Sequence, residues 1–266
     1  MKKRHLAALV CVLVAAFASP SGAITMGQPD GNGHPYVGAL VANIGDNGEP
    51  DLLCSGTLIS PRVFLTAGHC TDYLRANGIP RHDVWVTFDP TFDSASPLLR
   101  GRYHTHPDYG YSGPGGFSDP HDIAVVVLDS AASPQPARLP HLNELGTRNG
   151  NNSALRDQLF TAVGYGIARD TKTSGPNAFY FDGVRRRVDQ SFENLRSIWL
   201  KLNMNPSTGS GGTCYGDSGG PHFLKGTRKI VSITITGDTA CRSTDLTYRL
   251  DTRSARAFLD DFVTLP

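Results

Sequence analysis

The chain has 266 residues, of which 39% are hydrophobic and 18% charged, with 29 Gly and 18 Pro. This balance excludes a disordered chain, which would carry more charge, and the frequent Gly and Pro exclude a coiled coil. The 25 basic and 24 acidic side chains give a formal net charge of +1. Charge therefore indicates neither nucleic acid nor a membrane surface as a partner.

The first 23 residues have the organisation of a secretory signal peptide. Basic residues 2–4 precede an apolar run of thirteen residues, 6–18. This run is too short for a bilayer, which requires about 20 apolar residues. Small residues then offer cleavage after Ala18 or after Ala23. The sequence predicts a signal peptide at 1–23 and a secreted, extracellular protein without a membrane segment after its removal.

Five cysteines occur, and Cys11 lies within the predicted signal peptide. The other four are Cys54, Cys70, Cys214 and Cys241. Four cysteines in an oxidising compartment predict two disulfides, with three possible connectivities. They contain no C-x-x-C spacing, so a zinc cluster is the weaker alternative.

The apolar segments after the signal are short and rich in β-branched residues, and Gly, Pro, Asn and Asp separate them. Many short strands with little helical periodicity predict an all-β sandwich or barrel. The predicted strands are 37–44, 52–59, 63–66, 84–88, 123–128, 159–163, 198–202 and 230–235.

A proline-rich stretch at 133–140 is a predicted connector between two halves. The only clear helical signal is at the C-terminus, where apolar residues follow the i, i+3, i+4 spacing of one helix face. This stripe, expected to dock on the core, consists of Ala255, Phe258, Leu259, Phe262 and Val263.

Three short motifs carry reactive side chains: LTAGHC at 65–70, DIAVVVL at 122–128 and GDSGGP at 216–221. Each alone is compatible with a structural role. Together they supply the parts of nucleophilic catalysis. A serine hydroxyl such as that of Ser218 needs a base, His69 can be that base, and a carboxylate such as Asp122 can orient the imidazole.

With these motifs the sequence resembles the chymotrypsin/trypsin family of serine endopeptidases across essentially the whole chain from Ile24. The resemblance implies two packed six-stranded antiparallel β-barrels with a C-terminal α-helix. The peptidase domain would be 24–266, with barrels at about 24–133 and 141–266. The matching segments are 54–59, 66–70, 122–124, 164–166, 216–221 and 230–232.

The same resemblance implies the roles of individual residues. The catalytic triad would be His69, Asp122 and Ser218, and the oxyanion hole would be the backbone N–H groups of Gly216 and Ser218. The implied disulfides are Cys54–Cys70 and Cys214–Cys241.

The substrate pocket implied by the resemblance has Gly212 as its floor and Thr234 and Leu246 as its walls, while Ser232 offers its backbone to the substrate and hydrogen-bonds near Asp122. A neutral floor favours small or medium apolar side chains before the scissile bond, because a buried, unpaired substrate cation is costly. The alternative is basic, trypsin-like specificity through Asp245 in a shifted register.

Activation in the family uses a new N-terminus, and Ile24 resembles that residue, with Asp217 as the partner of its amino group. Cleavage after Ala23 would create this terminus directly. Cleavage after Ala18 would leave five residues for a second cut.

Two other functions are compatible with parts of the sequence. The segment 216–220 also fits G-x-S-x-G of α/β-hydrolases, but His222 is the only later histidine and no acidic residue separates it from Ser218. A protease-like binding module without activity remains an alternative, although all three triad positions are filled.

His104, His106 and His121 lie close together in the sequence, near Asp108 and Asp119, in a spacing that matches no zinc motif. We expect them to be solvated loop histidines, with no metal and no cofactor. The expected partners are protein or peptide substrates and protein protease inhibitors, and the chain is expected to be a monomer.

Overall fold

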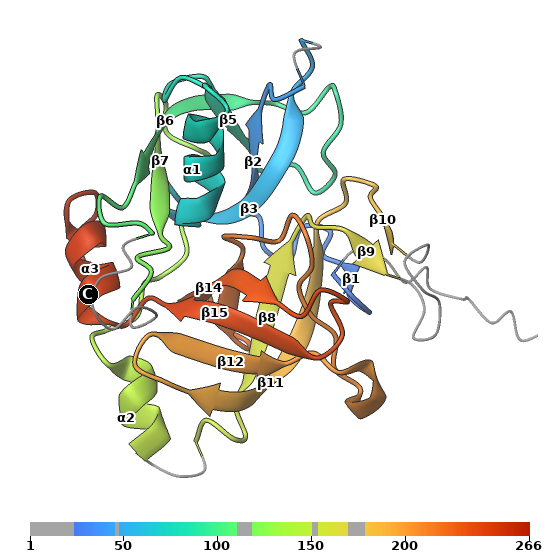
Figure 1. Ribbon diagram of the computed structural model, residues 1–266, viewed down its shortest axis with the longest axis vertical. Helices are drawn as coiled ribbons and strands as arrows, with labels where there is room; N and C mark the ends of the chain where they lie inside the picture. Colours follow the sequence, from blue (N-terminus) through green and yellow to red (C-terminus); the bar gives the residue numbers. More distant parts are fainter. Residues whose placement is uncertain (1–23, 46–47, 111–118, 151–153, 170–178) are drawn as a thin grey trace, which may run out of the picture.

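The structure is a computed structural model that describes residues 24–45, 48–110, 119–150, 154–169 and 179–266, so the predicted signal peptide lies outside it. Two antiparallel barrels, one above the other in Figure 1, make up most of the described chain. None of the helices in these ranges has the length and apolar character needed to cross a membrane. The helical elements are α1 (Gly68–Ala76), α2 (Glu144–Gly150), the 3₁₀ turn η2 (Pro206–Thr208) and α3 (Arg253–Asp260).

The first barrel closes in the order β2-β3-β4-β7-β6-β5. The first and last strands of this order pair directly, with Ala39 opposite Thr87. β-Branched and aromatic side chains fill its interior, which is the environment that these residue types favour. Its strands are β2 (Val37–Ala42), β3 (Asp51–Ser60), β4 (Val63–Thr66), β5 (Val84–Thr87), β6 (Leu99–Thr105) and β7 (Ala124–Leu128).

The second barrel runs β11-β12-β15-β14-β13-β8 and is closed by pairing of β11 with β8, while β1 pairs with the first two residues of β11. A separate ribbon pairs β9 with β10. The predicted fold of two six-stranded barrels is therefore confirmed. The strands are β1 (Gln28–Pro29), β8 (Leu159–Gly164), β9 (Ala168–Arg169), β10 (Phe179–Tyr180), β11 (Arg186–Leu195), β12 (Trp199–Asn203), β13 (Pro221–Leu224), β14 (Ile230–Gly237) and β15 (Thr244–Arg249).

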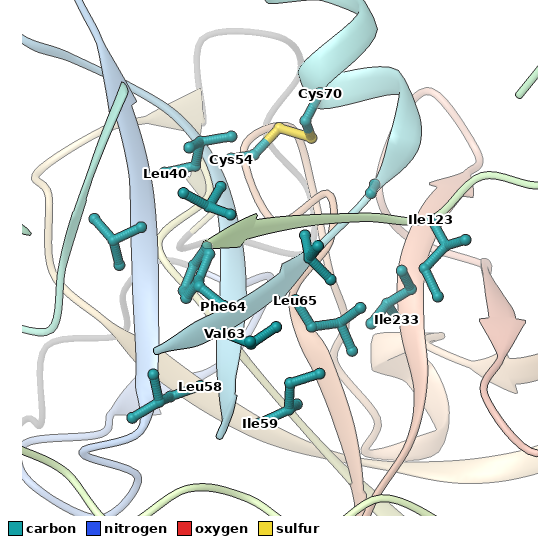
Figure 2. Close-up of a cluster of buried hydrophobic side chains, with 14 of the residues drawn as sticks. Leu40, Cys54, Leu58, Ile59, Val63, Phe64, Leu65, Cys70, Ile123 and Ile233 are labelled. Atoms are coloured by element: carbon teal, nitrogen blue, oxygen red, sulfur yellow. A yellow bond between two sulfur atoms is a disulfide. The ribbon is translucent and has the colours of Figure 1, made fainter. Parts of the chain in front are cut away.

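One hydrophobic cluster joins the two barrels. Figure 2 shows Ile233 of β14 beside Leu65 and Ile123, which come from the first barrel, and all three are fully buried. Because apolar side chains from both barrels share this cluster, the barrels are fixed relative to each other, and so are the loops that meet at their junction.

The C-terminal helix docks on the first barrel, although it follows the second barrel in the chain. The Phe258 ring lies 5.0 Å from that of His106, and the Phe262 ring lies 5.3 Å from that of His104. The predicted apolar stripe therefore packs as expected. However, α3 ends at Asp260, and Phe262 and Val263 belong to a turn whose N–H groups bond to Leu259.

Candidate active site

His69 and Asp122 meet at the ends of two neighbouring strands. β4 leads into α1, which carries His69 in its first turn, and β7 begins two residues after Asp122. Thr66 lies opposite Ala124 in this pair of strands. The Asp122 carboxylate accepts the His69 backbone N–H at 2.8 Å, and His69 Nδ1 lies 3.0 Å from Oδ2. The carboxylate is thus bonded to both the backbone N–H and the ring of His69, which fixes the orientation of the ring.

Burial distinguishes these two side chains. The Asp122 side chain is 7% exposed, whereas that of His69 is 31% exposed. With Nδ1 facing Asp122, the other ring nitrogen, Nε2, is left for a partner on the solvent side. A buried acceptor behind a half-exposed imidazole is the arrangement required of a general base.

The loop before β13 brings Ser218 to the same place. Its carbonyl oxygen accepts the Ser55 N–H at 3.0 Å. Gly219 has φ +76°, and a Cβ there would overlap Thr66 Oγ1 and the Ala67 nitrogen. This contact, possible only for glycine, seats the serine loop against the turn that leads to His69. In the described residues no hydrogen bond joins Ser218 Oγ to His69, and such bonds are commonly long before substrate binds.

Two backbone N–H groups beside Ser218 are free. Neither the Gly216 nor the Ser218 N–H finds an acceptor among the described residues. Gly216 adopts φ +93°, and its carbonyl accepts the Ser55 hydroxyl at 2.9 Å. Since backbone donors are normally satisfied, two unused N–H groups on the same short loop are suited to bind an oxygen anion.

Asp217 is fully buried between the two residues that carry these donors. Its carboxylate accepts the N–H groups of Gly166 at 2.8 Å and Cys214 at 2.9 Å. Gly164 and Gly166 leave the space that it occupies, because a Cβ at either would overlap it. Burial raises the pKa of Asp217 to about 7, and these backbone hydrogen bonds only partly oppose the shift.

The segment that begins at Ile24 is seated beside the serine loop. Ile24 is fully buried, and Thr25 exchanges two backbone hydrogen bonds with Gly212, at 2.8 and 3.0 Å. Within the described chain no ion pair or hydrogen bond joins Ile24 to Asp217.

Both disulfides implied by the resemblance are formed in the structure. Cys54–Cys70 ties β3 to α1, the helix that carries His69. Cys214–Cys241 ties the serine loop to the turn between β14 and β15. Each disulfide therefore restrains one of the two segments that meet at the site.

A cavity of about 210 Å³ opens next to Ser218. Hydroxyl-bearing side chains dominate its wall, and a buried Thr234 Oγ1 has no partner. The lining residues are Thr213, Cys214, Tyr215, Ser218, Thr234, Ile235, Thr236, Gly237, Asp238, Thr239 and Cys241.

Of the four predicted pocket residues, only Thr234 is among these lining residues of the described chain. Gly212 faces the Met204 side chain, which a Cβ at that position would overlap. Ser232 is buried and accepts the Thr247 hydroxyl at 2.8 Å. Leu246 lies in β15 opposite Lys201 and Thr236.

Asp245, the alternative source of basic specificity, is fully buried inside the second barrel. It accepts the Gln190 side-chain N–H at 2.9 Å and lies 3.1 Å from His222 Nε2. Its carboxylate is therefore engaged away from the cavity, and Asp245 is not one of the described lining residues.

Asp238 is the one carboxylate in the described lining, and it was not among the residues predicted for the pocket. Burial would raise its pKa, but the N–H groups of Thr244, Ser243 and Arg242 hold the pKa of Asp238 below its ordinary value. These three donors turn the carboxylate toward its own loop. The sequence signal that could have identified it is an Asp followed by a short polar turn before the next strand, since such a side chain often accepts N–H groups of its own turn.

The prediction that these histidines are solvated loop residues is wrong for His106. His106 is only 9% exposed, because its ring stacks on those of His121 and Phe258, at 4.5 and 5.0 Å. Burial and the nearby charge of His121 lower the pKa of His106. The sequence could not show this contact, since fourteen residues separate the two histidines.

Comparison with protein families matches residues 25–258 to the family described as Trypsin. A CLIP domain-containing serine protease B15 from Anopheles gambiae is 26% identical over 71% of this chain, a match that covers 54% of that protein. A trypsin from Saccharopolyspora erythraea is 25% identical over 79% of this chain and 84% of that protein.

Two further similarities bear on fold and function. The solved structure described as HL collagenase superposes with a TM-score of 0.61 at 18% identity, over 87% of this chain and 95% of that chain, which supports the fold. Glucanase inhibitor protein 4 from Phytophthora infestans is 27% identical over 64% of this chain and 62% of that protein.

Proposed function

The chain belongs to the trypsin family of serine proteases, and from this premise we propose that it is a secreted endopeptidase with the catalytic triad Ser218, His69 and Asp122. The observation that carries the proposal is the bonding of one buried carboxylate to both the backbone and the ring of His69. We further propose that residues 1–23 are the signal peptide and that 24–266 act as a monomer on protein or peptide substrates, subject to protein inhibitors.

In the first half of the reaction, Ser218 Oγ attacks the carbonyl carbon of the scissile bond. His69 Nε2 takes the hydroxyl proton, while Nδ1–H donates to Asp122 and the carboxylate stabilises the imidazolium. The proton then passes from Nε2 to the leaving amine as the C–N bond breaks. The product is an ester between the acyl group and Ser218, together with a free amine.

The second half repeats these steps with water. His69 takes a proton from the water as its oxygen attacks the ester, and returns the proton to Ser218 Oγ as the acid product leaves. In both halves the N–H groups of Gly216 and Ser218 receive the negative carbonyl oxygen. Removing one such donor in a comparable site costs about 10²–10³ in kcat.

The cavity beside Ser218 supports a preference for small or medium apolar side chains before the scissile bond. Its lining offers hydroxyl and methyl groups of threonine, the Cys214–Cys241 disulfide and one carboxylate already bonded to three N–H groups. A substrate lysine or arginine would lose its hydration there without gaining a free anion.

A panel of peptides that differ only in the residue before the cut tests activity and specificity together. In the form that begins at Ile24, we expect kcat/KM for Ala, Val or Leu to exceed that for Lys or Arg by at least tenfold, measured by release of a fluorescent leaving group. A preference for Arg would contradict the apolar pocket and implicate Asp238.

If none of the peptides is hydrolysed, the result would instead favour the second candidate, a binding module without activity. The similarity to a glucanase inhibitor protein is the observation that favours it. This conclusion holds only if the chain is correctly folded, which is verified by its two disulfides and a cooperative thermal transition.

We also propose that activation depends on a new amino group at Ile24. Asp217 lies fully buried with two backbone donors but no cation among the described contacts, and an ammonium group would compensate its charge. The bonds between Thr25 and Gly212 already hold the following residue next to the serine loop. Pairing would stabilise the loop that carries Gly216 and Ser218.

The raised pKa of Asp217 predicts a distinct pH dependence for a chain that begins at Ser19. Below pH 4 the carboxyl is protonated in both folded and unfolded states. Between pH 4 and 7 only the unfolded state releases its proton, so the free energy of unfolding should fall by about 4 kcal/mol. Urea denaturation across this range, with Ser218→Ala in the background to prevent self-digestion, measures it.

Two controls accompany this measurement. Asp217→Asn in the same chain removes the titrating group and should abolish that fall. The chain that begins at Ile24 should also lack it, because the ammonium keeps Asp217 ionised. Equal pH dependence in all three chains would show that Asp217 is not the group responsible.

A further inference from the structure

Three side chains with metal-ligand chemistry converge at the edge of the first barrel, outside the candidate active site. His106, Asp108 and His121 each present one ligand atom, and these atoms all lie within 4.8 Å of one another. His106 follows β6 directly, and β7 begins three residues after His121. The two adjacent strands therefore bring the cluster together from separate parts of the chain.

His121 is held with a free nitrogen in the cluster. Its Nδ1 is buried and has no hydrogen-bond partner, whereas its Nε2 lies 3.7 Å from Asp119 Oδ2. Asp119 is itself fixed, because its Oδ1 accepts the His121 backbone N–H at 2.9 Å and the Tyr248 hydroxyl at 3.0 Å. A histidine whose second nitrogen faces a carboxylate is the usual form of a metal ligand, since the carboxylate fixes the tautomer.

The other two residues are held beside it. His106 is confined between the rings of His121 and Phe258, and its Nδ1 accepts the Asp108 backbone N–H at 3.1 Å. This bond fixes the start of the Asp108 side chain next to the His106 ring. The Asp108 side chain is exposed, so its carboxylate can rotate toward the imidazoles.

The backbone of His121 also adopts an uncommon conformation. It has φ +51°, a left-handed conformation that is uncommon for a residue other than glycine. Backbone strain of this kind persists where the surrounding structure requires a particular side-chain position. Here it accompanies the stacking of the His121 ring on that of His106.

We propose that His106, Asp108 and His121 bind one divalent transition-metal ion of the Zn²⁺ class. Two imidazoles and one carboxylate suit such an ion, whereas Ca²⁺ and Mg²⁺ prefer oxygen ligands throughout. Tetrahedral zinc separates its ligand atoms by about 3.3 Å, so rotation of the exposed Asp108 and small ring movements complete the site. The fourth position is open to water. This site does not depend on the proposed peptidase activity.

The test uses the chain from Ile24 with Ser218→Ala, stripped by a chelator and titrated with ZnCl₂ against a chromophoric zinc indicator. We expect one Zn²⁺ per chain. Asp108→Asn and His121→Asn should each weaken binding at least tenfold, and Asp119→Asn should weaken it about 10–100-fold. Asparagine is chosen at position 121 because it tolerates the left-handed backbone. His82→Gln, at an exposed histidine outside the cluster, is the matched control and should bind as the parent does.

Titration with Co²⁺ gives a second readout, because nitrogen ligands produce a visible absorption band that His121→Asn should remove. Since Asp108 is exposed, Asp108→Asn keeps the test valid if a histidine variant fails to fold. Absence of saturable 1:1 binding, or equal affinity in the parent and the Asp108 and His121 variants, would overturn the proposal.

Discussion

Ser218→Ala in the chain that begins at Ile24 is expected to lower kcat for peptide hydrolysis by about 10⁶-fold while leaving the folded structure intact. The reason is that the variant loses the nucleophile, so no acyl intermediate can form. His69→Ala should cost a similar factor, because without the base the hydroxyl retains its proton. Steady-state kinetics with the preferred peptide, at enzyme concentrations high enough to detect residual turnover, measures both.

The double variant distinguishes a catalytic unit from two independent contributions. If Ser218 and His69 act together, the double variant should be little worse than either single one. Ser207→Ala, at an exposed serine in η2, is the matched control and should retain activity. Near-normal kcat in Ser218→Ala would disprove the proposed mechanism, whatever the pocket accepts.

Arg185→Met is expected to destabilise the folded chain strongly, because it removes a buried cation and its hydrogen bonds. The Arg185 side chain is fully buried and lies 3.0 Å from Asp30, also buried. Its other donors bond to the carbonyl groups of Val37, Phe88 and Gly31 at 2.8, 3.0 and 2.8 Å. Removing one member of a buried ion pair costs about 3–5 kcal/mol, to be measured by urea denaturation.

In the Arg185→Met variant the buried Asp30 carboxylate would keep fewer stabilising interactions. Burial alone would raise its pKa, but hydrogen bonds and charge from His34, with the charge of Arg185, hold the pKa of Asp30 below its ordinary value. Arg187→Met is the matched control, because Arg187 is half-exposed and 3.8 Å from Asp30, so its loss should cost under about 1 kcal/mol.

A double-mutant cycle completes this test. Adding Asp30→Asn to Arg185→Met removes the buried charge that Arg185 no longer compensates and should recover part of the loss. A cost below about 1 kcal/mol for Arg185→Met would show that the buried network does not hold the N-terminal segment to the barrels.

The strands that the sequence predicts are those with apolar β-branched runs, and most of these are in the first barrel. The strands that it does not predict are polar or short. β11 reads RRVDQSFENL, yet Gln190 is fully buried in it because its amide binds Asp245 across the barrel interior. When a strand buries polar groups that bind one another, its sequence lacks the alternating apolar residues from which a strand is predicted.

The catalytic candidates could be predicted because each lies in a short motif, but the pocket walls could not. β14 and β15 change register between Thr234 and Thr236, so one extra residue intervenes and Leu246 lies opposite Thr236. Such a bulge alters which side chains face the cavity without leaving a local signal. Likewise, the contact of His106 with His121 exists only once β6 and β7 pair.

The two disulfides have a consequence for the covalent continuity of the molecule. One lies within the first barrel and the other within the second, and in the described chain none crosses between them. A single break in the connector, residues 133–140, would therefore yield two separately cross-linked fragments held together by noncovalent contacts alone. Such a nicked molecule is a heterodimer whose integrity depends on concentration, and its two fragments are candidates for complementation when expressed as separate chains.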